Sequence, residues 1–351
     1  MDLAEFDYTL PDELIAQTPL AERAASRMLV VDRARGCWED RQFRDLPAFL
    51  HAGDCLVLND SRVFPARLFG HRVGRAGHVE VLLLRPVDGA AREWEALVHP
   101  GKKMRVGERV LFAERLEAEV IARRGFGERT LRFAGEGDVY EEFEKIGHVP
   151  LPPYIRRQDE AADRERYQTV FAREKGSAAA PTAGLHFTPQ VLDACRASGA
   201  DIAFVTLHVG LGTFQPIHAD RIEGYRLHTE RYRITADNAA RMTASRRLVA
   251  VGTTCVRTIE SAIESAIESA MDIATPGGGL RESSGETDIF IYPPFEFRAT
   301  GAMLTNFHLP RTSLLLLVCA FAGKDLALAA YRHAVEQRYR FYSYGDCMLI
   351  V

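Results

Sequence analysis

Residues 65–150 carry a pattern that the rest of the chain does not share, and this change of pattern is the strongest constraint on the fold. Short apolar runs are separated by turn-forming residues. Within 116–120, apolar residues alternate with glutamates, which is the period of a half-buried strand. The strands predicted in this way are 78–87, 93–99, 109–112, 116–123 and 130–133. Several short strands at this spacing favour a small β-barrel or a sandwich.

Residues 181–351 alternate helices with strands instead. Strands are predicted at 202–207, 248–251, 288–292 and 302–306. Helices are predicted after Thr188-Pro189, after a cap at Asp237, after Gly252, over 314–322 with Thr312 or Ser313 as the cap, and from Lys324. This alternation implies an α/β domain. The first 64 residues add a short helix at 11–17 and strands at 28–32 and 55–58.

The sequence Ile-Glu-Ser-Ala occurs three times in residues 259–270. On a helix its glutamates, Glu260, Glu264 and Glu268, fall on one stripe and repel one another weakly. We therefore expect a duplication that extends a surface helix.

The composition is that of a folded globular protein without a membrane segment. The 351 residues suggest about two domains, and 47% of them are hydrophobic. The most apolar run, 314–322, is far shorter than the ~20 residues that span a bilayer. The N-terminal residues 1–12 carry no basic segment of the kind that opens a signal peptide. Six scattered cysteines show no disulfide or zinc spacing, so we expect a cytoplasmic protein.

The charge of the chain leaves nucleic-acid binding open. The net charge is −4, so the whole molecule is not a basic nucleic-acid binder. However, the chain has 39 arginines and 5 lysines. Base composition of the genome explains this bias, and so does a need for guanidinium groups that bind phosphates and base edges. A local basic patch can bind RNA on an acidic protein.

Four polar segments stand where predicted strands meet helices. His186 lies in a Pro/Gly loop before a helix. His208 follows a strand and precedes Gly210 and Gly212, where backbone can approach a ligand. Thr253 and Thr254 begin a helix that carries Arg257 in its first turn or so, which suits a carboxylate or a phosphate. His308 follows another strand.

Each segment alone has a simpler explanation, such as a surface histidine, a turn or an ordinary helix cap. Ligands of open α/β sheets gather at the carboxyl ends of the strands, so the four segments together predict one site there. The chain has no P-loop, no GxGxxG after a strand, no GxSxG, no HExxH and no Cys–His zinc cluster.

Longer segments carry a resemblance to a known family. The most specific are APTAGLHF (180–187), HVGLGTF (208–214) and TNFHLP (305–310). FDYTLPDELIAQTPLAERAASRML (6–29), LVLNDSRVFPARLFG (56–70), RYQTVFA (166–172), VGTTCVRTIES (251–261) and RYRFYSYGDCMLI (338–350) add to them. In this set and order the chain resembles the S-adenosylmethionine:tRNA ribosyltransferase-isomerases of queuosine biosynthesis over essentially its whole length.

The resemblance implies both a fold and a reaction. The fold is an α/β main domain, residues 1–64 plus 151–351, with a small β-barrel domain inserted at 65–150. The reaction moves the ribosyl part of S-adenosylmethionine to 7-aminomethyl-7-deazaguanine at the wobble position of tRNAs with GUN anticodons. It isomerises that part to an epoxycyclopentane and releases adenine and methionine. S-adenosylmethionine is then a co-substrate, and neither a metal nor a tightly bound cofactor is expected. The partners are the tRNA and S-adenosylmethionine, with no membrane, and a monomer is expected.

The resemblance also suggests roles for residues in the matched segments. His186, His208 and His308 are candidates for proton transfer, and the sequence leaves open which of them acts as the base. Thr253, Thr254 and Arg257 are expected to hold the methionine carboxylate. Further expected contacts to S-adenosylmethionine are Gly210, Gly212, Asp288 and Glu230. Arg27, Arg62 and Arg67 are the expected phosphate contacts.

The sequence departs from the family pattern at three places. Residues 285–287 read Gly-Glu-Thr where many relatives have Gly-Trp-Thr, Pro294 replaces a usual glycine, and Cys255 replaces a usual serine. Two other functions stay open. An S-adenosylmethionine-dependent RNA methyltransferase would make S-adenosylhomocysteine instead of adenine, and a non-catalytic RNA-binding module would bind without turnover.

Overall fold

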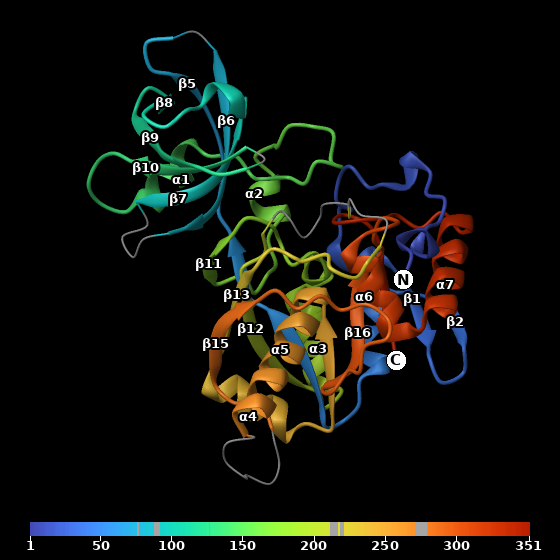
Figure 1. Ribbon diagram of the computed structural model, residues 1–351. Helices are drawn as coiled ribbons and strands as arrows, with labels where there is room; N and C mark the ends of the chain where they lie inside the picture. The colour runs from blue at the N-terminus through green and yellow to red at the C-terminus, as the bar shows by residue number, and fades with distance from the viewer. Residues whose placement is uncertain (76, 88–91, 126, 211–216, 218–220, 271–278) are drawn as a thin grey trace.

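Nine strands form one mixed sheet, and the chain leaves and re-enters this sheet around a separate β-barrel (Figure 1). The computed structural model describes residues 1–75, 77–87, 92–125, 127–210, 217, 221–270 and 279–351. The sheet order is β15-β13-β12-β3-β14-β16-β17-β1-β2. In chain order these strands are β1 (Arg27–Asp32), β2 (Cys37–Gln42), β3 (Asp54–Asn59), β12 (Asp201–Leu207), β13 (Glu230–Ile234), β14 (Arg247–Val251), β15 (Ser283–Thr287), β16 (Thr300–Asn306) and β17 (Cys347–Ile350).

The strand directions place the ends of four strands at one edge. β12, β3, β14 and β16 are parallel neighbours. β17 runs antiparallel to β16, and β1 runs parallel to β17, so both begin at the edge where β16 ends. The loops before β1 and β17 therefore lie at the carboxyl edge of the four parallel strands.

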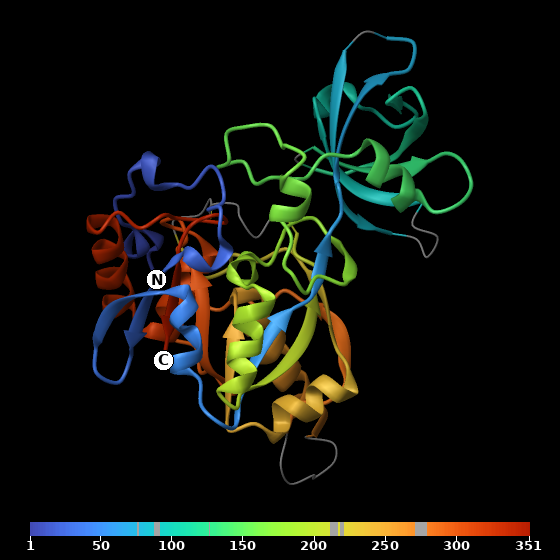
Figure 2. The same ribbon diagram turned by 180° about the vertical axis from the view of Figure 1, so that it is seen from behind.

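Helices cover both faces of the sheet because its central strands bury both sets of side chains. One face packs against α4 (Ala236–Ala244), α5 (Thr253–Ala270), α6 (Ser313–Ala322) and α7 (Lys324–Glu336) (Figure 1). The other face packs against α3 (Pro189–Ala197) and the 3₁₀ segments η4 (Phe43–Phe49) and η6 (Thr182–His186) (Figure 2). Every residue of β3 is buried, as expected for a strand inside a two-sided sheet.

The barrel is closed and antiparallel, with strand order β10-β7-β6-β5-β8-β9. Its strands are β5 (Arg67–Arg72), β6 (His78–Pro86), β7 (Glu93–His99), β8 (Arg109–Phe112), β9 (Leu116–Arg123) and β10 (Glu128–Phe133). Helix α1 (Val139–Ile146) packs Phe143 and Tyr140 against the buried Trp94 at ring-centroid distances of 5.4 Å. This aromatic contact fixes α1 against the barrel strands.

A short parallel pair joins the barrel to the sheet. β4 (Ser61–Val63) leads from the sheet into the barrel. After the barrel the chain passes through α2 (Asp163–Arg166) and then forms β11 (Glu174–Ser177), which pairs with β4. The connecting segment is held to the C-terminal loop by Asp163, whose carboxylate accepts hydrogen bonds from Arg157 at 2.6 and 2.8 Å and from the Tyr344 hydroxyl at 2.8 Å. The remaining 3₁₀ segments are η1 (Leu3–Phe6), η2 (Asp12–Leu14), η3 (Arg23–Ala25) and η5 (Gly101–Lys103).

The predicted fold class, α/β with an inserted small β-barrel, is confirmed. The exact domain boundaries at 65 and 150 stay a prediction. Among the described residues, no single helix is long and apolar enough to cross a membrane, and α6 and α7 meet these criteria only as a pair bent by 116°.

Four local predictions were wrong. Residues 11–17 form only the single turn η2, and residues 288–292 form no strand, since the strand lies at Ser283–Thr287 instead. Helix α4 has Thr235 as its N-cap, so Asp237 lies in the first turn. The first copy of the repeat is buried, because the Glu260 carboxylate accepts the backbone N–H groups of residues 298–300 at 2.9 to 3.3 Å.

Candidate functional site

The carboxyl edge of the parallel strands brings residues of all four predicted segments into one pocket. The pocket is narrow, with a cavity volume of about 20 Å³. Its lining comes from the loop before η6, the end of β12, the start of α5, the end of β16 and the start of α6. These residues are Ala180, Pro181, Thr182, Ala183, Val209, Gly252, Thr253, Thr254, Thr305, His308 and Leu314. We call this the edge pocket.

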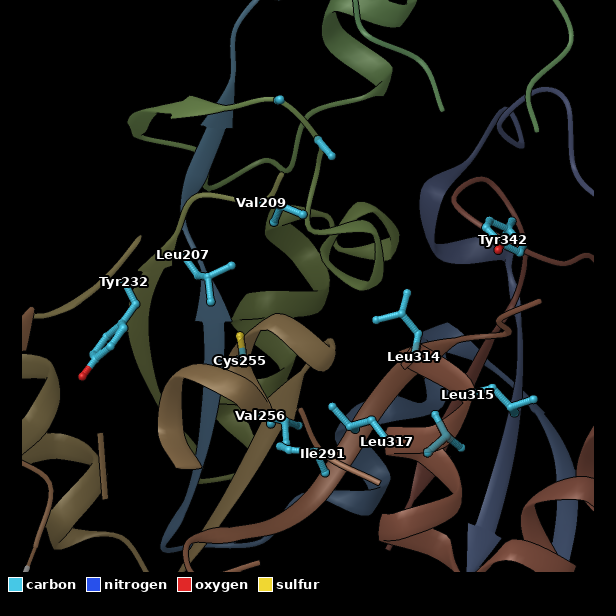
Figure 3. Close-up of a cluster of buried hydrophobic side chains, with 14 of the residues drawn as sticks. Leu207, Val209, Tyr232, Cys255, Val256, Ile291, Leu314, Leu315, Leu317 and Tyr342 are labelled. Carbon is cyan, nitrogen blue, oxygen red and sulfur yellow. The ribbon is translucent and has the colours of Figure 1, made fainter. Parts of the chain in front are cut away.

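An apolar layer supports the edge pocket from below. Leu207 and Val209 at the end of β12 lie above Cys255 and Val256 of α5, and Leu314 and Leu317 of α6 lie to the side (Figure 3). Burial raises the pKa of the Cys255 thiol, which keeps it protonated and makes it part of this layer. The packing fixes the starts of two helices around the pocket.

The start of α5 presents polar groups to the edge pocket. Gly252 has φ +88°, a conformation that favours glycine, and it turns the chain from β14 directly into α5. The first N–H groups of a helix have no partner within the helix, and the helix dipole favours an anion there. The Thr254 hydroxyl is buried and has no hydrogen-bond partner in the part of the chain that the structure describes. This end of the pocket is therefore suited to a carboxylate or another acceptor.

His308 lies in the edge pocket, and three hydrogen-bonding contacts fix its position. Its Nε2 is 2.8 Å from the Thr305 hydroxyl, its backbone N–H donates to the Tyr331 hydroxyl at 3.1 Å, and its carbonyl accepts from the Tyr8 hydroxyl. Burial lowers the pKa of His308 to about 3. The imidazole is thus neutral at neutral pH, and the same burial makes it a weaker base than an exposed histidine.

His186 lies behind the edge pocket, in the wall of a second pocket. Its Nδ1 is 2.9 Å from the Ser26 hydroxyl and its Nε2 is 3.3 Å from the Asn306 amide nitrogen. The amide can only donate, so Nε2 accepts and Nδ1 carries the proton. Burial lowers the pKa of His186 to about 4. Nε2 has a hydrogen-bond partner in both histidines, and only His308 lines the edge pocket.

His208 lies at the end of β12 and lines neither pocket. A Cβ on Gly176 would lie 3.0 Å from its ring, so the imidazole packs closely on that backbone. Burial lowers the pKa of His208, and among the described residues its Nδ1 has no hydrogen-bond partner. The structure thus separates the three histidines that the sequence grouped.

Arg257 and Glu230 form a buried ion pair beside the edge pocket, with their side chains only 4% and 3% exposed. The second carboxylate oxygen of Glu230 accepts the backbone N–H of Gly210 at 2.9 Å. Arg257 Nε donates to the Ile289 carbonyl at 3.3 Å, whereas its Nη2 has no partner among the described residues. The pair therefore fastens the loop after β12 and the segment after β15 to α5.

The remaining candidates for contact with S-adenosylmethionine are less central. Asp288 is exposed, and Gly212 lies outside the described residues. Gly210 does not line the edge pocket, but its N–H bond to Glu230 joins it to the ion pair. The residues that sequence reasoning missed are Ser26 and Asn306, which hold His186. Asn306 stands in a segment that the sequence singled out.

Two of the three predicted phosphate-binding arginines have carboxylate partners. Arg27 lies over the Tyr339 ring and pairs with Asp40 at 3.3 Å, and Arg67 pairs with Glu80 at 3.2 Å. Arg62 is exposed and lines a cleft of about 580 Å³ between β4, α1 and α2. No three His, Cys, Asp or Glu side chains in the described part of the chain are placed to hold a metal ion.

The two buried histidines make the fold sensitive to acid. The folded-state pKa is about 4 for His186 and about 3 for His308, below the ordinary value of 6.5. Between pH 6.5 and these values the unfolded chain therefore binds more protons than the folded protein. We expect the free energy of unfolding to be fully retained above about pH 6.5 and to fall by several kcal/mol as the pH drops through this range, at ~1.4 kcal/mol per unit and group. Urea unfolding at stepped pH measures this. His186→Gln should remove part of the slope, and an unchanged slope would contradict the assignment.

The fold and the site define a class. An α/β sheet with an inserted barrel carries a pocket at the carboxyl ends of its parallel strands, and a helix start, hydroxyl groups and a histidine line it. This is the arrangement of an enzyme that acts on a small polar substrate.

Comparison with known proteins gives the family. The model of the family described as queuosine biosynthesis protein matches residues 3–350, and the chain belongs to this family. It is 67% identical to the S-adenosylmethionine:tRNA ribosyltransferase-isomerase of Solibacter usitatus and 51% identical to that of Symbiobacterium thermophilum, each over 100% of both chains. The crystal structure of the S-adenosylmethionine tRNA ribosyltransferase of Thermotoga maritima is similar with a TM-score of 0.53 and 36% identity, covering 99% of this chain and 100% of that one.

Proposed function

We propose that the protein transfers the ribosyl part of S-adenosylmethionine to 7-aminomethyl-7-deazaguanine at the wobble position of tRNA and isomerises it to the epoxycyclopentane of epoxyqueuosine. Adenine and methionine are the products released. The observation that carries the proposal is the edge pocket, because the family's most specific segments meet there. The match over residues 3–350 supports it.

The chemistry needs a base, a holder for the methionine carboxylate and a way to bring the tRNA base close. The sulfonium of S-adenosylmethionine acidifies the neighbouring C5′, so a neutral histidine can remove a proton there. His308 has that form and lines the pocket. Expulsion of adenine then lets the aminomethyl nitrogen attack C1′.

The start of α5 is the proposed holder of the methionine carboxylate. Thr253 and Thr254 line the pocket, the Thr254 hydroxyl has no partner among the described residues, and the helix dipole attracts an anion. Arg257 pairs with Glu230, so its part is to position this end of the pocket, with Nη2 as its remaining donor. Independence from metal ions, the cytoplasmic location and the choice of GUN anticodons stay predictions.

The test is the identity of the products. The protein is incubated with S-adenosylmethionine and an anticodon stem-loop that carries 7-aminomethyl-7-deazaguanine at the wobble position, and the mixture is analysed by mass spectrometry. We expect adenine, methionine and an RNA that has gained the rearranged ribosyl group. The matched control is the same stem-loop with guanine at that position, which lacks the nucleophile and should give no RNA product. S-adenosylhomocysteine as the product would indicate a methyltransferase, and binding without any product would indicate a binding module.

A further inference from the structure

Two arginines from distant parts of the chain line the second pocket, which contains His186, and a third arginine lies beside it. Arg23 comes from η3, Arg166 ends α2, and Arg340 lies between α7 and β17. Arg23 and Arg166 line the pocket together with Ser26, His186 and Ser343. Arg340 belongs to the same cluster, because it donates to the Thr18 carbonyl, next to Pro19 and Leu20 in the pocket wall, and Arg166 donates to the Leu20 carbonyl. We call Arg23, Arg166 and Arg340 the arginine cluster.

The arginine cluster is bonded to backbone carbonyls. Arg23 donates to the carbonyls of Leu185 at 3.1 Å and Glu165 at 2.9 Å. Arg166 donates to those of Ala21 at 2.9 Å and Leu20 at 2.6 Å. Arg340 donates to that of Thr18. The N-terminal and C-terminal loops that these bonds join lie side by side above the sheet (Figures 1 and 2).

The positive charge of the arginine cluster is not neutralised within the described part of the chain. None of its three guanidinium groups forms an ion pair there, whereas Arg27 and Arg67 each have a carboxylate partner. Arg166 Nε and Arg340 Nη1 are buried and have no hydrogen-bond partner among the described residues. Burial lowers the pKa of Arg23 and of Arg340, and the charge of Arg166 lowers the pKa of Arg23 further.

Glu165 and Asp346 act on Arg23 and Arg340 electrostatically, but neither forms an ion pair with them in the described part of the chain. Asp346 accepts the backbone N–H groups of Arg27 and Arg340, and burial raises its pKa. Asp163 is bound by the Arg157 guanidinium. Glu165 is exposed, and it contacts Arg23 through its backbone carbonyl. An excess of positive charge with free N–H groups in a half-buried pocket is a site for an anion.

The placement of the cluster indicates which anion it binds. η6 runs between the two pockets, with Thr182 and Ala183 lining the edge pocket and Leu185 and His186 lining the second one. A ligand in the second pocket therefore lies next to the proposed S-adenosylmethionine site. Three guanidinium groups exceed what one amino-acid carboxylate needs, and the start of α5 already suits that carboxylate. Arginine matches the geometry of phosphate oxygens.

We propose that the arginine cluster binds a backbone phosphate of the RNA substrate next to the nucleotide that is modified. This inference rests on the proposed function, because it takes RNA to be the second substrate. The phosphate holds the strand beside η6 while the flanking base reaches toward the edge pocket. The cluster then contributes to RNA affinity and leaves the affinity for S-adenosylmethionine unchanged.

The test uses an unmodified anticodon stem-loop with guanine at the wobble position, so binding is measured without turnover. We expect Arg166→Gln and Arg340→Gln each to weaken RNA binding about tenfold at ~0.1 M salt and to lower the slope of log affinity against log salt by about 0.7, the value for one single-strand phosphate contact. The affinity for S-adenosylmethionine, measured on the same samples, should not change.

Arg33→Gln is the matched control. Arg33 is also half-buried and bonded to backbone carbonyls, those of Val351, Phe321 and Gly301, but it lies at the opposite edge of the sheet. The Arg33→Gln substitution changes the net charge by the same amount as Arg166→Gln or Arg340→Gln. If Arg33→Gln lost as much RNA affinity as the cluster variants, long-range attraction between the protein and the RNA would explain the loss. That result would overturn the proposal.

A second measurement needs no protein variant. Neutral methylphosphonate linkages are placed one at a time around the wobble nucleotide, and binding to the wild-type protein is measured. One position should weaken binding about tenfold, and the same substitution should have no further effect on Arg166→Gln. Equal affinity at every position would overturn the proposal, as would a loss of S-adenosylmethionine binding in the arginine variants. If the proposed reaction itself were wrong, product analysis would detect no adenine and no modified RNA, whereas the RNA-binding results would be unaffected.

Discussion

Replacing His308 with alanine is expected to lower the rate of adenine release by about 10²–10⁴-fold, which is the usual contribution of a positioned acid–base group. The ring lies in the edge pocket, neutral and fixed through Thr305, Tyr331 and Tyr8. The affinity for S-adenosylmethionine should stay nearly the same, because loss of a proton-transfer group mainly affects the transition state. Single-turnover adenine release and equilibrium binding measure the two quantities separately.

The control is His333→Ala, since His333 pairs with Asp40 away from both pockets. His186→Ala and His208→Ala are made in parallel. His186→Ala should reduce stability as well as turnover, because Ser26 and Asn306 lose their partner. A large loss of turnover in His208→Ala with none in His308→Ala would transfer the role to His208. Wild-type turnover in all three variants would exclude histidine and favour a carboxylate such as Glu230 or Asp288.

Glu230→Gln is expected to destabilise the protein by about 3–5 kcal/mol, because it leaves the Arg257 charge buried without its partner. The same change weakens the hold on Gly210, so the loop after β12 should become more open to proteolysis. Urea unfolding at neutral pH measures the free energy. This is the largest effect on stability that we expect from a single polar substitution in the site.

Two further variants test the reason for this effect. Glu230→Gln combined with Arg257→Met removes both charges and should be clearly more stable than Glu230→Gln alone. Asp12→Asn breaks an ion pair with Arg156 in which both side chains are 70% exposed, and it should cost less than about 1 kcal/mol. If Glu230→Gln lowered the free energy of unfolding as little as Asp12→Asn, the buried Arg257–Glu230 pair would not be stabilising this edge of the sheet.

The sequence predicted most of the barrel because alternation of apolar and polar residues is a local property. β7, β8 and β9 were predicted with their exact ends. β5 was missed, since Arg67–Arg72 mixes charged residues with Gly70, and a Cβ on Gly70 would lie 2.6 Å from the Leu111 carbonyl oxygen. The alternation there is broken by a close approach of two backbones, which only the three-dimensional structure reveals.

The wrong strand at 288–292 shows the limit of apolar runs as evidence. That segment buries Ile291 against the core but pairs with no strand. The strand that pairs with β13 is Ser283–Thr287, which is mostly exposed and carries no apolar stripe. A partner strand with free N–H and C=O groups decides which segment pairs, and the local sequence does not contain that information.

The meeting of the four polar segments in the edge pocket was predictable, because parallel strands end at the same edge. The division of the histidines between two pockets was not. It depends on Ser26 and Asn306, which meet at His186 only because β1 lies beside β17 and β17 beside β16. Sequence distance gave no sign of the Glu230–Arg257 pair or of the arginine cluster.

The place of β17 in the sheet has a consequence for how the protein is made. β17, Cys347–Ile350, is more than 300 residues after β1 in the chain, and it lies between β16 and β1 and bonds to both. The hairpin of β1 and β2 therefore has no neighbouring strand in the sheet until residues 347–350 have been synthesised. Pairings this distant along the chain form slowly and leave strand edges exposed meanwhile. We expect nascent chains of this protein to depend on chaperones until β17 has been synthesised, and chains that stop before Cys347 to leave β1 and β2 unpaired with the rest of the sheet.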